Sequence, residues 1–419
     1  MASGRGFGLN ILFATLVDIN SIEERGIYQD LMRELTCMGH SVFVVSPAER
    51  RHKKPTLFDS SGSGGLLKVR VGNIQKTGRI EKGLAMLLLE YQFVQAVRKY
   101  LHHVRFDLVV YSTPPITLVK LIKFIKKRDN ATSYLLLKDI FPQNAVDLRL
   151  FSGSSLIYRF FRRKESALYA VSDHIGCMSQ ANVSYLLAHN RELEKDRVHV
   201  CPNSIMPREF GIRNSEFGIV LGRGAVREKY GLPADRRIFV YGGNLGRPQC
   251  VPFIVECLKL NQEKHDRYFV ICGSGTDAGV LTAYINSNRP KNVKVFDMLP
   301  KDSYDELLSA CDVGLIFLDS RFTIPNFPSR LLSYMEQGLP VLACTDMNTD
   351  VGEVIKAGGF GLWCESRDPV KFTQLADGIC SMDFATQKEM GLNGRRYLEE
   401  NYLASQAAEI ILESVKCKV

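Results

Sequence analysis

Residues 238–247 read Ile-Phe-Val-Tyr-Gly-Gly-Asn-Leu-Gly-Arg, an apolar run that ends in a glycine-rich turn. β-Branched and aromatic residues in such a run are typical of a buried strand. Glycines in the turn can adopt positive φ angles and let backbone N–H groups approach a phosphate closely. The segment therefore predicts a strand followed by a phosphate-binding turn, although a purely structural glycine turn stays an open alternative. It does not match G-x-G-x-x-G, so no dinucleotide fingerprint is predicted.

Strand-like runs alternate with helical patterns on both sides of this segment. In the second half they cover residues 238–241, 268–272, 293–296, 313–318, 341–344 and 361–364, and in the first half residues 11–17, 42–46, 108–112, 134–138, 175–178 and 198–201. Between them, apolar residues recur at helical spacing, most clearly at Ile80, Leu84, Leu88, Tyr91 and Val94, which predicts an amphipathic helix. Such alternation implies parallel sheets whose ligands bind beyond the carboxyl ends of the strands.

The chain's 419 residues exceed what one hydrophobic core usually organises. We therefore expect an α/β architecture of two Rossmann-like, doubly wound parallel-sheet domains facing a cleft. The predicted N-terminal domain covers residues 1–205, the C-terminal domain covers residues 225–395, and a helical segment over residues 396–419 crosses back to the N-terminal domain. The Ser/Gly tract at residues 60–65 predicts a loop.

The composition, with 45% hydrophobic and 24% charged residues, excludes a disordered or fibrous chain. Apolar runs such as residues 9–17 and 84–89 are shorter than the ~20 residues of a membrane-spanning helix, and residues 1–8 lack the pattern of a secretory signal. Eleven cysteines occur without a C-x-x-C pair, which predicts free thiols in a reducing compartment rather than disulfides or zinc. Together these features predict a cytoplasmic protein.

The formal net charge of +9 is concentrated at residues 50–54, 120–128 and 159–164. Such clusters suit anionic partners, with ordinary solvated surface as the alternative. Residues 157–164 mix aromatic side chains with cations, so they predict peripheral association with an anionic membrane surface. A core-packed helix with a basic outer face is the alternative for that run.

Two more segments follow strands of the second half. Cys272-Gly273-Ser274-Gly275 would keep side chains out of a pocket at the carboxyl edge of the sheet. Residues 325–341 predict a short helix that starts near Pro328, ends at Gly338 and leads into a strand. A helix start offers free N–H donors, so it could hold a diphosphate, with Arg330 one turn in as a forked ligand. A packing role is the alternative for each segment.

In the first half, residues 137–147 place ionisable groups at the end of an apolar strand. Asp139 could orient an acceptor hydroxyl there, or it could cap the following turn. Asp18 and residues 23–26 follow the first strand in the same way.

The order of these segments resembles retaining glycosyltransferases of family 4, which have the GT-B fold. The resemblance rests on Gly39-His40-Ser41-Val42, Cys201-Pro202-Asn203-Ser204, Asp312-Val313-Gly314-Leu315 and Gly338-Leu339-Pro340-Val341. Residues 138–147, 241–246 and 328–341 look most like the branch that builds bacterial surface polysaccharides, such as the aminodeoxysugar transferases of O-antigen assembly.

The resemblance also implies roles for individual residues. Arg247 and Arg330 would act at the leaving diphosphate, and Asp139 would lie beside the reacting sugar. The implied donor site consists of Gly243, Asn244, Gly273, Ser274, Gly275, Leu299, Ser329 and Ser333, and the implied acceptor site of Asp18, Gly26, Lys138 and Gln143. Members of the family commonly carry two glutamates, whose positions are taken here by Pro325 and Ser333. Ser333, or another group such as Glu336, would then hold the donor ribose.

We therefore expect a retaining glycosyltransferase of hexosyl or N-acetylhexosaminyl type. It would move a sugar from a nucleotide diphosphate donor, with a UDP-sugar favoured, to a hydroxyl of a lipid-linked saccharide at the inner membrane face, in O-antigen or capsule biosynthesis. Neither a metal nor another cofactor is expected, because cationic side chains can stabilise the leaving charge. Nucleic acid is not an expected partner. The alternatives are a catalytically silent nucleotide-binding paralogue in a polysaccharide assembly complex, and a GT-B sugar epimerase or phosphorylase.

Overall fold

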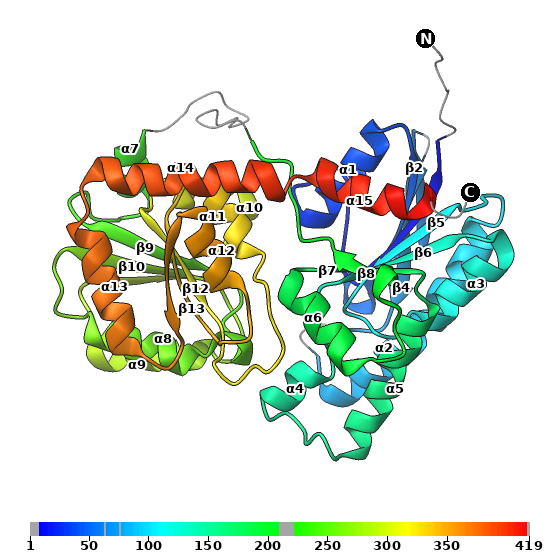
Figure 1. Ribbon diagram of the computed structural model, residues 1–419, viewed down its shortest axis with the longest axis horizontal. Helices are drawn as coiled ribbons and strands as arrows, with labels where there is room; N and C mark the ends of the chain where they lie inside the picture. The colour runs from blue at the N-terminus through cyan, green and yellow to red at the C-terminus, as the bar shows by residue number, and fades with distance from the viewer. Residues whose placement is uncertain (1–7, 63, 75–76, 209–221, 417–419) are drawn as a thin grey trace, which may run out of the picture. The chain divides into compact units, whose positions relative to one another are not determined.

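The computed structural model describes residues 8–62, 64–74, 77–208 and 222–416. Residues 1–7, 63, 75–76, 209–221 and 417–419 lie outside this range. The chain divides into two compact units, Met1–Met206 with Ala404–Val419, and Pro207–Leu403 (Figure 1). Each unit is built around a sheet of its own.

The first unit contains an eight-stranded sheet in the order β3-β4-β2-β1-β5-β6-β7-β8. Its strands are β1 (Asn10–Ala14), β2 (Ser41–Glu49), β3 (Leu57–Ser61), β4 (Gly64–Val71), β5 (Leu108–Ser112), β6 (Thr132–Leu137), β7 (His174–Cys177) and β8 (Val198–Val200). All six predicted runs of the first half are strands, and they pair in parallel. The expected loop at residues 60–65 is wrong, because its ends belong to the antiparallel pair β3–β4.

Helices cover both faces of this sheet (Figure 1). They are α1 (Ile27–Cys37), α2 (Arg79–Tyr100), α3 (Val119–Asp129), α4 (Gln143–Asp147), α5 (Leu156–Val171), α6 (Gln180–His189) and α15 (Ala404–Lys416), with single 3-10 turns at Arg50–His52 and Lys195–Arg197. One core packs alternate strand residues, such as Phe13 and Val110, against Leu35 of α1 and Ile411 of α15. The C-terminal helix therefore completes the first unit.

The helix expected from the spacing of Leu84, Leu88 and Tyr91 is α2, but these three residues lie on its exposed side. Leu89, Phe93 and Val97 are the buried residues of α2, whereas Leu84, Leu87, Leu88 and Tyr91 are each between 55% and 62% exposed. The sequence carries apolar residues around most of this helix, so spacing alone did not show which stripe meets the sheet.

The second unit contains a six-stranded parallel sheet in the order β11-β10-β9-β12-β13-β14. Its strands are β9 (Arg237–Gly242), β10 (Arg267–Cys272), β11 (Val293–Phe296), β12 (Val313–Phe317), β13 (Val341–Thr345) and β14 (Gly361–Glu365), as the sequence predicts. The chain builds outward from β9 to β11 and then returns to the other side of β9 with β12. Ligands of such sheets bind at this switch point, beyond the carboxyl ends of the strands.

Helices also cover both faces of the second sheet (Figure 1). They are α7 (Arg223–Lys229), α8 (Val251–Leu260), α9 (Ala278–Asn288), α10 (Lys301–Leu308), α11 (Arg330–Glu336), α12 (Val351–Gly358), α13 (Pro369–Ser381) and α14 (Phe384–Asn401), with a 3-10 turn at Arg247–Gln249. Phe253, Leu281 and Phe372 from α8, α9 and α13 share one core with β9, β10 and β12.

No helix in the described ranges combines the length and low polarity that are needed to cross a bilayer.

Candidate functional site

Two glycine turns interlock where β9 and β10 end. The Gly243 N–H donates to the Cys272 carbonyl and the Leu245 N–H donates to the Ser274 carbonyl, both at 2.9 Å. A Cβ on Gly273 would lie 1.8 Å from the Gly243 carbonyl oxygen, and Gly243 itself has φ +124°. These turns therefore pack backbone on backbone, at a distance that only glycine allows.

The expectation that the first turn offers its backbone N–H groups to a phosphate needs correction. The N–H groups of Gly243 and Leu245 are used by the second turn, and the Gly246 N–H donates to Gln249 Oε1 at 3.3 Å. Three donors of the turn are thus already hydrogen-bonded within the protein. The glycines let the two turns pack closely together, and the positive charge of the site comes from a side chain.

Arg330 supplies such a charge at the same place. Helix α11 begins at Arg330 itself rather than one turn earlier, and it has seven residues. The Arg330 guanidinium lies 4.3 Å from the centre of the Tyr241 ring, and a Cβ on Gly243 would be 3.2 Å from its Nη2. The side chain, more than the dipole of this short helix, therefore makes the site cationic.

The guanidinium of Arg330 lacks a counter-charge. Its Nη1 is buried and has no hydrogen-bond partner, and the ion pairs found among the described residues do not include Arg330. Burial raises the pKa of Tyr334 to about 12 and that of Tyr304 well above its usual value, so both neighbours are neutral hydroxyls at neutral pH. A guanidinium with a buried N–H group that has no partner costs stability, and such groups are typical of anion-binding sites.

Three tyrosines around Arg330 were not among the predicted site residues. The Tyr241 hydroxyl donates to the Asn244 carbonyl at 2.6 Å, so Tyr241 supports both the turn and the guanidinium. Tyr304 packs against Gly242, where a Cβ would lie 1.9 Å from its hydroxyl oxygen, and Tyr334 donates to the Leu315 carbonyl at 3.0 Å. Tyr241 borders the glycine turn in the sequence, but nothing in the helical patterns pointed to the other two.

The remaining predicted donor residues differ in their exposure. The Asn244 amide donates to Gln249 Oε1 at 2.9 Å. Arg247 is exposed, Leu299 is half-buried in the segment before α10, Ser329 is exposed just before α11, and Ser333 is half-buried in its first turn.

Glu336, considered as a replacement for the missing glutamate, is engaged elsewhere. It is buried, and its Oε1 accepts a hydrogen bond from the Arg208 N–H at 2.9 Å. This carboxylate therefore anchors the start of the second unit.

In the first unit, Lys138 and Asp139 follow β6 and have shifted pKa values. Burial lowers the pKa of Lys138 to about 8 and raises that of Asp139 to about 6. Thr113 Oγ1 holds the turn by accepting from the N–H groups of both residues, at 2.9 and 3.1 Å. Both side chains thus have pKa values close enough to neutral pH for proton exchange.

The predicted acceptor residues are only partly brought together. Gly26 directly precedes α1, whose Ile27 and Tyr28 line a small pocket with Lys138. Asp18 is exposed and pairs with Lys68 of β4. The Gln143 amide donates to Asp147 at 2.8 Å and accepts from the Tyr158 hydroxyl at 3.3 Å. Asp18 and Gln143 are thus held by other partners within the first unit.

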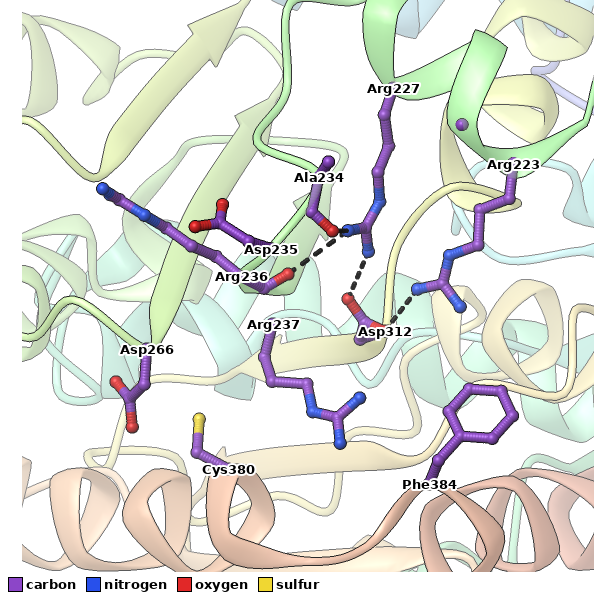
Figure 2. Close-up of a pocket in the computed structure, with 11 residues that line it drawn as sticks. Arg223, Arg227, Ala234, Asp235, Arg236, Arg237, Asp266, Asp312, Cys380 and Phe384 are labelled. Atoms are coloured by element: carbon purple, nitrogen blue, oxygen red, sulfur yellow. Dashed lines mark hydrogen bonds and ion pairs between the residues drawn. The ribbon is translucent and has the colours of Figure 1, made fainter.

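A cavity of about 540 Å³ lies at the amino ends of the strands in the second unit (Figure 2). Arg237, the first residue of β9, and Asp312, which precedes β12, both line it. Figure 2 shows Arg223 and Arg227 directed at the Asp312 carboxylate, to which both are bonded. The cavity therefore lies at the edge of the sheet opposite Arg330, and two of its arginines share the single negative charge of Asp312.

Residues 223–397 match the family model described as Glycosyl transferases group 1, and they hold both glycine turns and Arg330. The second unit is a glycosyl transferase group 1 domain. The chain is 24% identical over 330 residues, 78% of each protein, to "Probable glycosyltransferase WbjE" of Pseudomonas aeruginosa.

Solved structures share the fold of the whole chain. WaaG, a glycosyltransferase involved in lipopolysaccharide biosynthesis, matches with a TM-score of 0.62 at 16% identity, over 96% of this chain and 99% of its own. Anabaena Alr3699/HepE in complex with UDP-glucose matches with a TM-score of 0.67 at 14% identity, over 98% of this chain and 100% of that one. The expected α/β architecture of two Rossmann-like domains, the GT-B fold, is therefore confirmed.

Proposed function

We propose that the protein is a retaining glycosyltransferase that moves a hexosyl or N-acetylhexosaminyl group from a nucleotide diphosphate sugar to a hydroxyl of a lipid-linked saccharide. The observation that carries this proposal is the buried, unpaired Nη1 of Arg330 beside Gly243. A diphosphate would supply the missing counter-charge and the missing hydrogen-bond acceptor together. The UDP-glucose complex of Alr3699/HepE supports a UDP-sugar, and the role of WaaG supports cell-surface polysaccharide biosynthesis.

In the proposed reaction, the acceptor hydroxyl attacks the anomeric carbon from the side that the nucleotide leaves. The bond from that carbon to the diphosphate oxygen breaks as the new glycosidic bond forms, and the departing phosphate accepts the hydroxyl proton. Arg330 stabilises the leaving charge, with Arg247 as a second cation. Asp139 holds the reacting sugar, and Ser333 contacts the donor ribose.

The test is nucleotide release by the purified full chain, measured across a panel of nucleotide sugars with and without a lipid-linked saccharide. We expect release only when both substrates are present. Release without an acceptor would favour an epimerase, and formation of a sugar phosphate would favour a phosphorylase. Tight nucleotide binding without turnover of any donor would favour the silent paralogue, which Pro325 and Ser333 at the glutamate positions motivate.

Turnover should continue when divalent metals are removed, because Arg330 provides a fixed positive charge at the leaving group. The measurement is kcat in excess chelator, with and without added magnesium or manganese. In the described part of the chain, no three His, Cys, Asp or Glu side chains form a group that could hold a metal ion. Activity that disappears in chelator and returns with metal would contradict this prediction.

Replacing Ser333 with glutamate should tighten donor binding about tenfold without raising kcat. Ser333 is half-buried in the first turn of α11, and a carboxylate there could accept charge-assisted hydrogen bonds from a ribose. Because the ribose does not react, the gain should appear equally in the ground and transition states. The measurement is the donor Kd together with kcat, with Ser381→Glu on exposed α13 as a charge-matched control. An unchanged donor Kd would remove Ser333 from the ribose site.

We also propose that the protein works at the cytoplasmic face of the inner membrane, bound peripherally to anionic lipid. Support comes from the start of α5, where Ile157 and Phe160 are exposed beside the exposed cations Arg159 and Arg163. Ile157 and Phe160 are therefore available at the surface, whereas Phe161 of the same run packs against Phe141.

A further inference from the structure

An apolar stripe on α2 has no partner within the described residues. Leu84, Leu87, Leu88 and Tyr91 lie at helical spacing on one side of the helix and are more than half exposed, while the other side packs against the first sheet through Leu89 and Phe93. A contiguous exposed apolar patch on a protein usually marks a contact surface. A helix that is apolar on nearly all sides normally has both faces covered.

The unpaired charges of α2 around this stripe are positive. Besides the stripe itself, the exposed positions of α2 within residues 81–100 are Lys82, Gly83, Gln95, Arg98 and Lys99, none of which is acidic. The two carboxylates of the helix are used elsewhere: Glu81 pairs with Arg50, and buried Glu90 accepts the Lys120 N–H. The exposed part of α2 therefore presents leucines and a tyrosine together with cations.

Helix α5 carries the same combination and lies next to α2. Both helices pack against α3, and burial raises the pKa of Glu90 in α2 while the ammonium of Lys164 in α5 opposes that rise. The exposed positions at the start of α5 are Leu156, Ile157, Arg159, Phe160 and Arg163. Among the described residues of these two segments, the acidic side chain that reaches the surface is Glu81, which is 39% exposed and paired with Arg50.

We infer that α2 inserts its Leu84–Tyr91 stripe into an anionic lipid bilayer, with α5 lying beside it at the headgroup level. Leucine side chains with neighbouring cations are what an interfacial helix needs, because the apolar area enters the acyl boundary while the cations meet anionic headgroups. The positive charge of this surface favours an anionic bilayer over a second copy of the chain as its partner, since two copies would bring like charges together. The inference rests on the proposed lipid-linked acceptor for its biological role, but not for its test.

The test is flotation of the full chain with vesicles of phosphatidylcholine alone or mixed with phosphatidylglycerol, at low and at high salt. Salt screens the contribution of the cations but not that of the leucines. The variant combines Leu84→Ser, Leu87→Ser and Leu88→Ser. The matched control combines Leu260→Ser, Val280→Ser and Val370→Ser, which are exposed apolar positions of the second unit.

For the parent and the control we expect binding to the phosphatidylglycerol vesicles that persists in part at high salt. The α2 variant should bind about a hundredfold more weakly, and its remaining binding should vanish at high salt. Its melting temperature and donor Kd should match those of the parent, since neither the sheet nor the second unit is changed. Because the assay contains no donor or acceptor, its result is independent of whether sugar transfer is found.

Three outcomes would overturn the inference. The α2 variant could bind as the parent does, or the parent could fail to bind phosphatidylglycerol vesicles. A parent that is dimeric by light scattering, does not bind vesicles and becomes monomeric in the α2 variant would assign the stripe to self-association instead.

Discussion

Replacing Arg330 with alanine is expected to lower kcat by about a hundredfold or more. If Arg330 holds the leaving diphosphate, its charge matters most in the transition state, where the negative charge on the nucleotide grows. Removal of one such contact typically costs about 2.7–4 kcal/mol of transition-state stabilisation, which corresponds to that loss of rate. Arg330→Lys should recover part of the activity, because the charge remains while the planar fork is lost.

The melting temperature of an Arg330 variant distinguishes a functional role of this side chain from a structural one. The Nη1 of Arg330 is buried without a partner, so the guanidinium should cost the apo protein free energy rather than stabilise it. Arg330→Met, which keeps much of the side-chain volume, should therefore leave the melting temperature unchanged or raise it by a few degrees while turnover is lost. An arginine kept for packing would show the opposite change in melting temperature.

The control for Arg330 is Arg236→Ala, because Arg236 lines the cavity at the opposite edge of the same sheet. It should keep the parent's kcat and donor Kd. A correctly folded Arg330→Ala protein whose kcat stays within about threefold of the parent would refute the diphosphate assignment, since that change is under 0.7 kcal/mol.

Most strands could be predicted from the sequence, because buried parallel strands are short apolar runs that end in polar or glycine-rich turns. The hairpin of β3 and β4 was missed even though Leu67, Val69 and Val71 alternate with polar residues and point into the core. The Ser/Gly tract at residues 60–65 has the composition of a loop, although it joins the two strands. A tight turn between paired strands has the same composition as a loop.

A different reason explains why the buried face of α2 could not be predicted from the sequence. Helical spacing gives the angle between apolar residues, but it does not say which stripe meets the sheet when the helix has two. Leu89 and Phe93 form one stripe, and Leu88 and Tyr91 belong to the other. Only the packing of the first unit decided between them.

The site residues in glycine turns after strands could be predicted from the sequence. The site tyrosines that lie on helices could not. The glycine segments and Arg330 stand out in the sequence, and the fold brings them together at the switch point between β9 and β12. Tyr304 and Tyr334 lie in helices whose patterns predict core residues, so their place beside Arg330 depends on tertiary packing. The engagement of Glu336 by the Arg208 N–H could not be seen for the same reason.

Replacing Gly273 with alanine should weaken donor binding about a hundredfold. The added Cβ would lie 1.8 Å from the Gly243 carbonyl oxygen, which is backbone and cannot rotate away. The first turn must therefore move, and Gly243 is the residue against which the Arg330 guanidinium lies. Overpacking of this kind typically costs about 1–3 kcal/mol, so the melting temperature should also fall.

Gly279→Ala is the matched control for this effect, because it makes the same chemical change on α9, where nothing lies within 4 Å of the added methyl group. Alanine in a helix is favoured over glycine by about 0.5–1 kcal/mol, so this variant should be as stable as the parent or slightly more stable. The measurement is the donor Kd by titration calorimetry alongside the melting temperature of both variants. If Gly273→Ala binds the donor as tightly as Gly279→Ala does, the interlocked turns only hold β9 and β10 together. If the donor Kd rises in Gly273→Ala alone, the position of the first turn against Arg330 determines donor affinity.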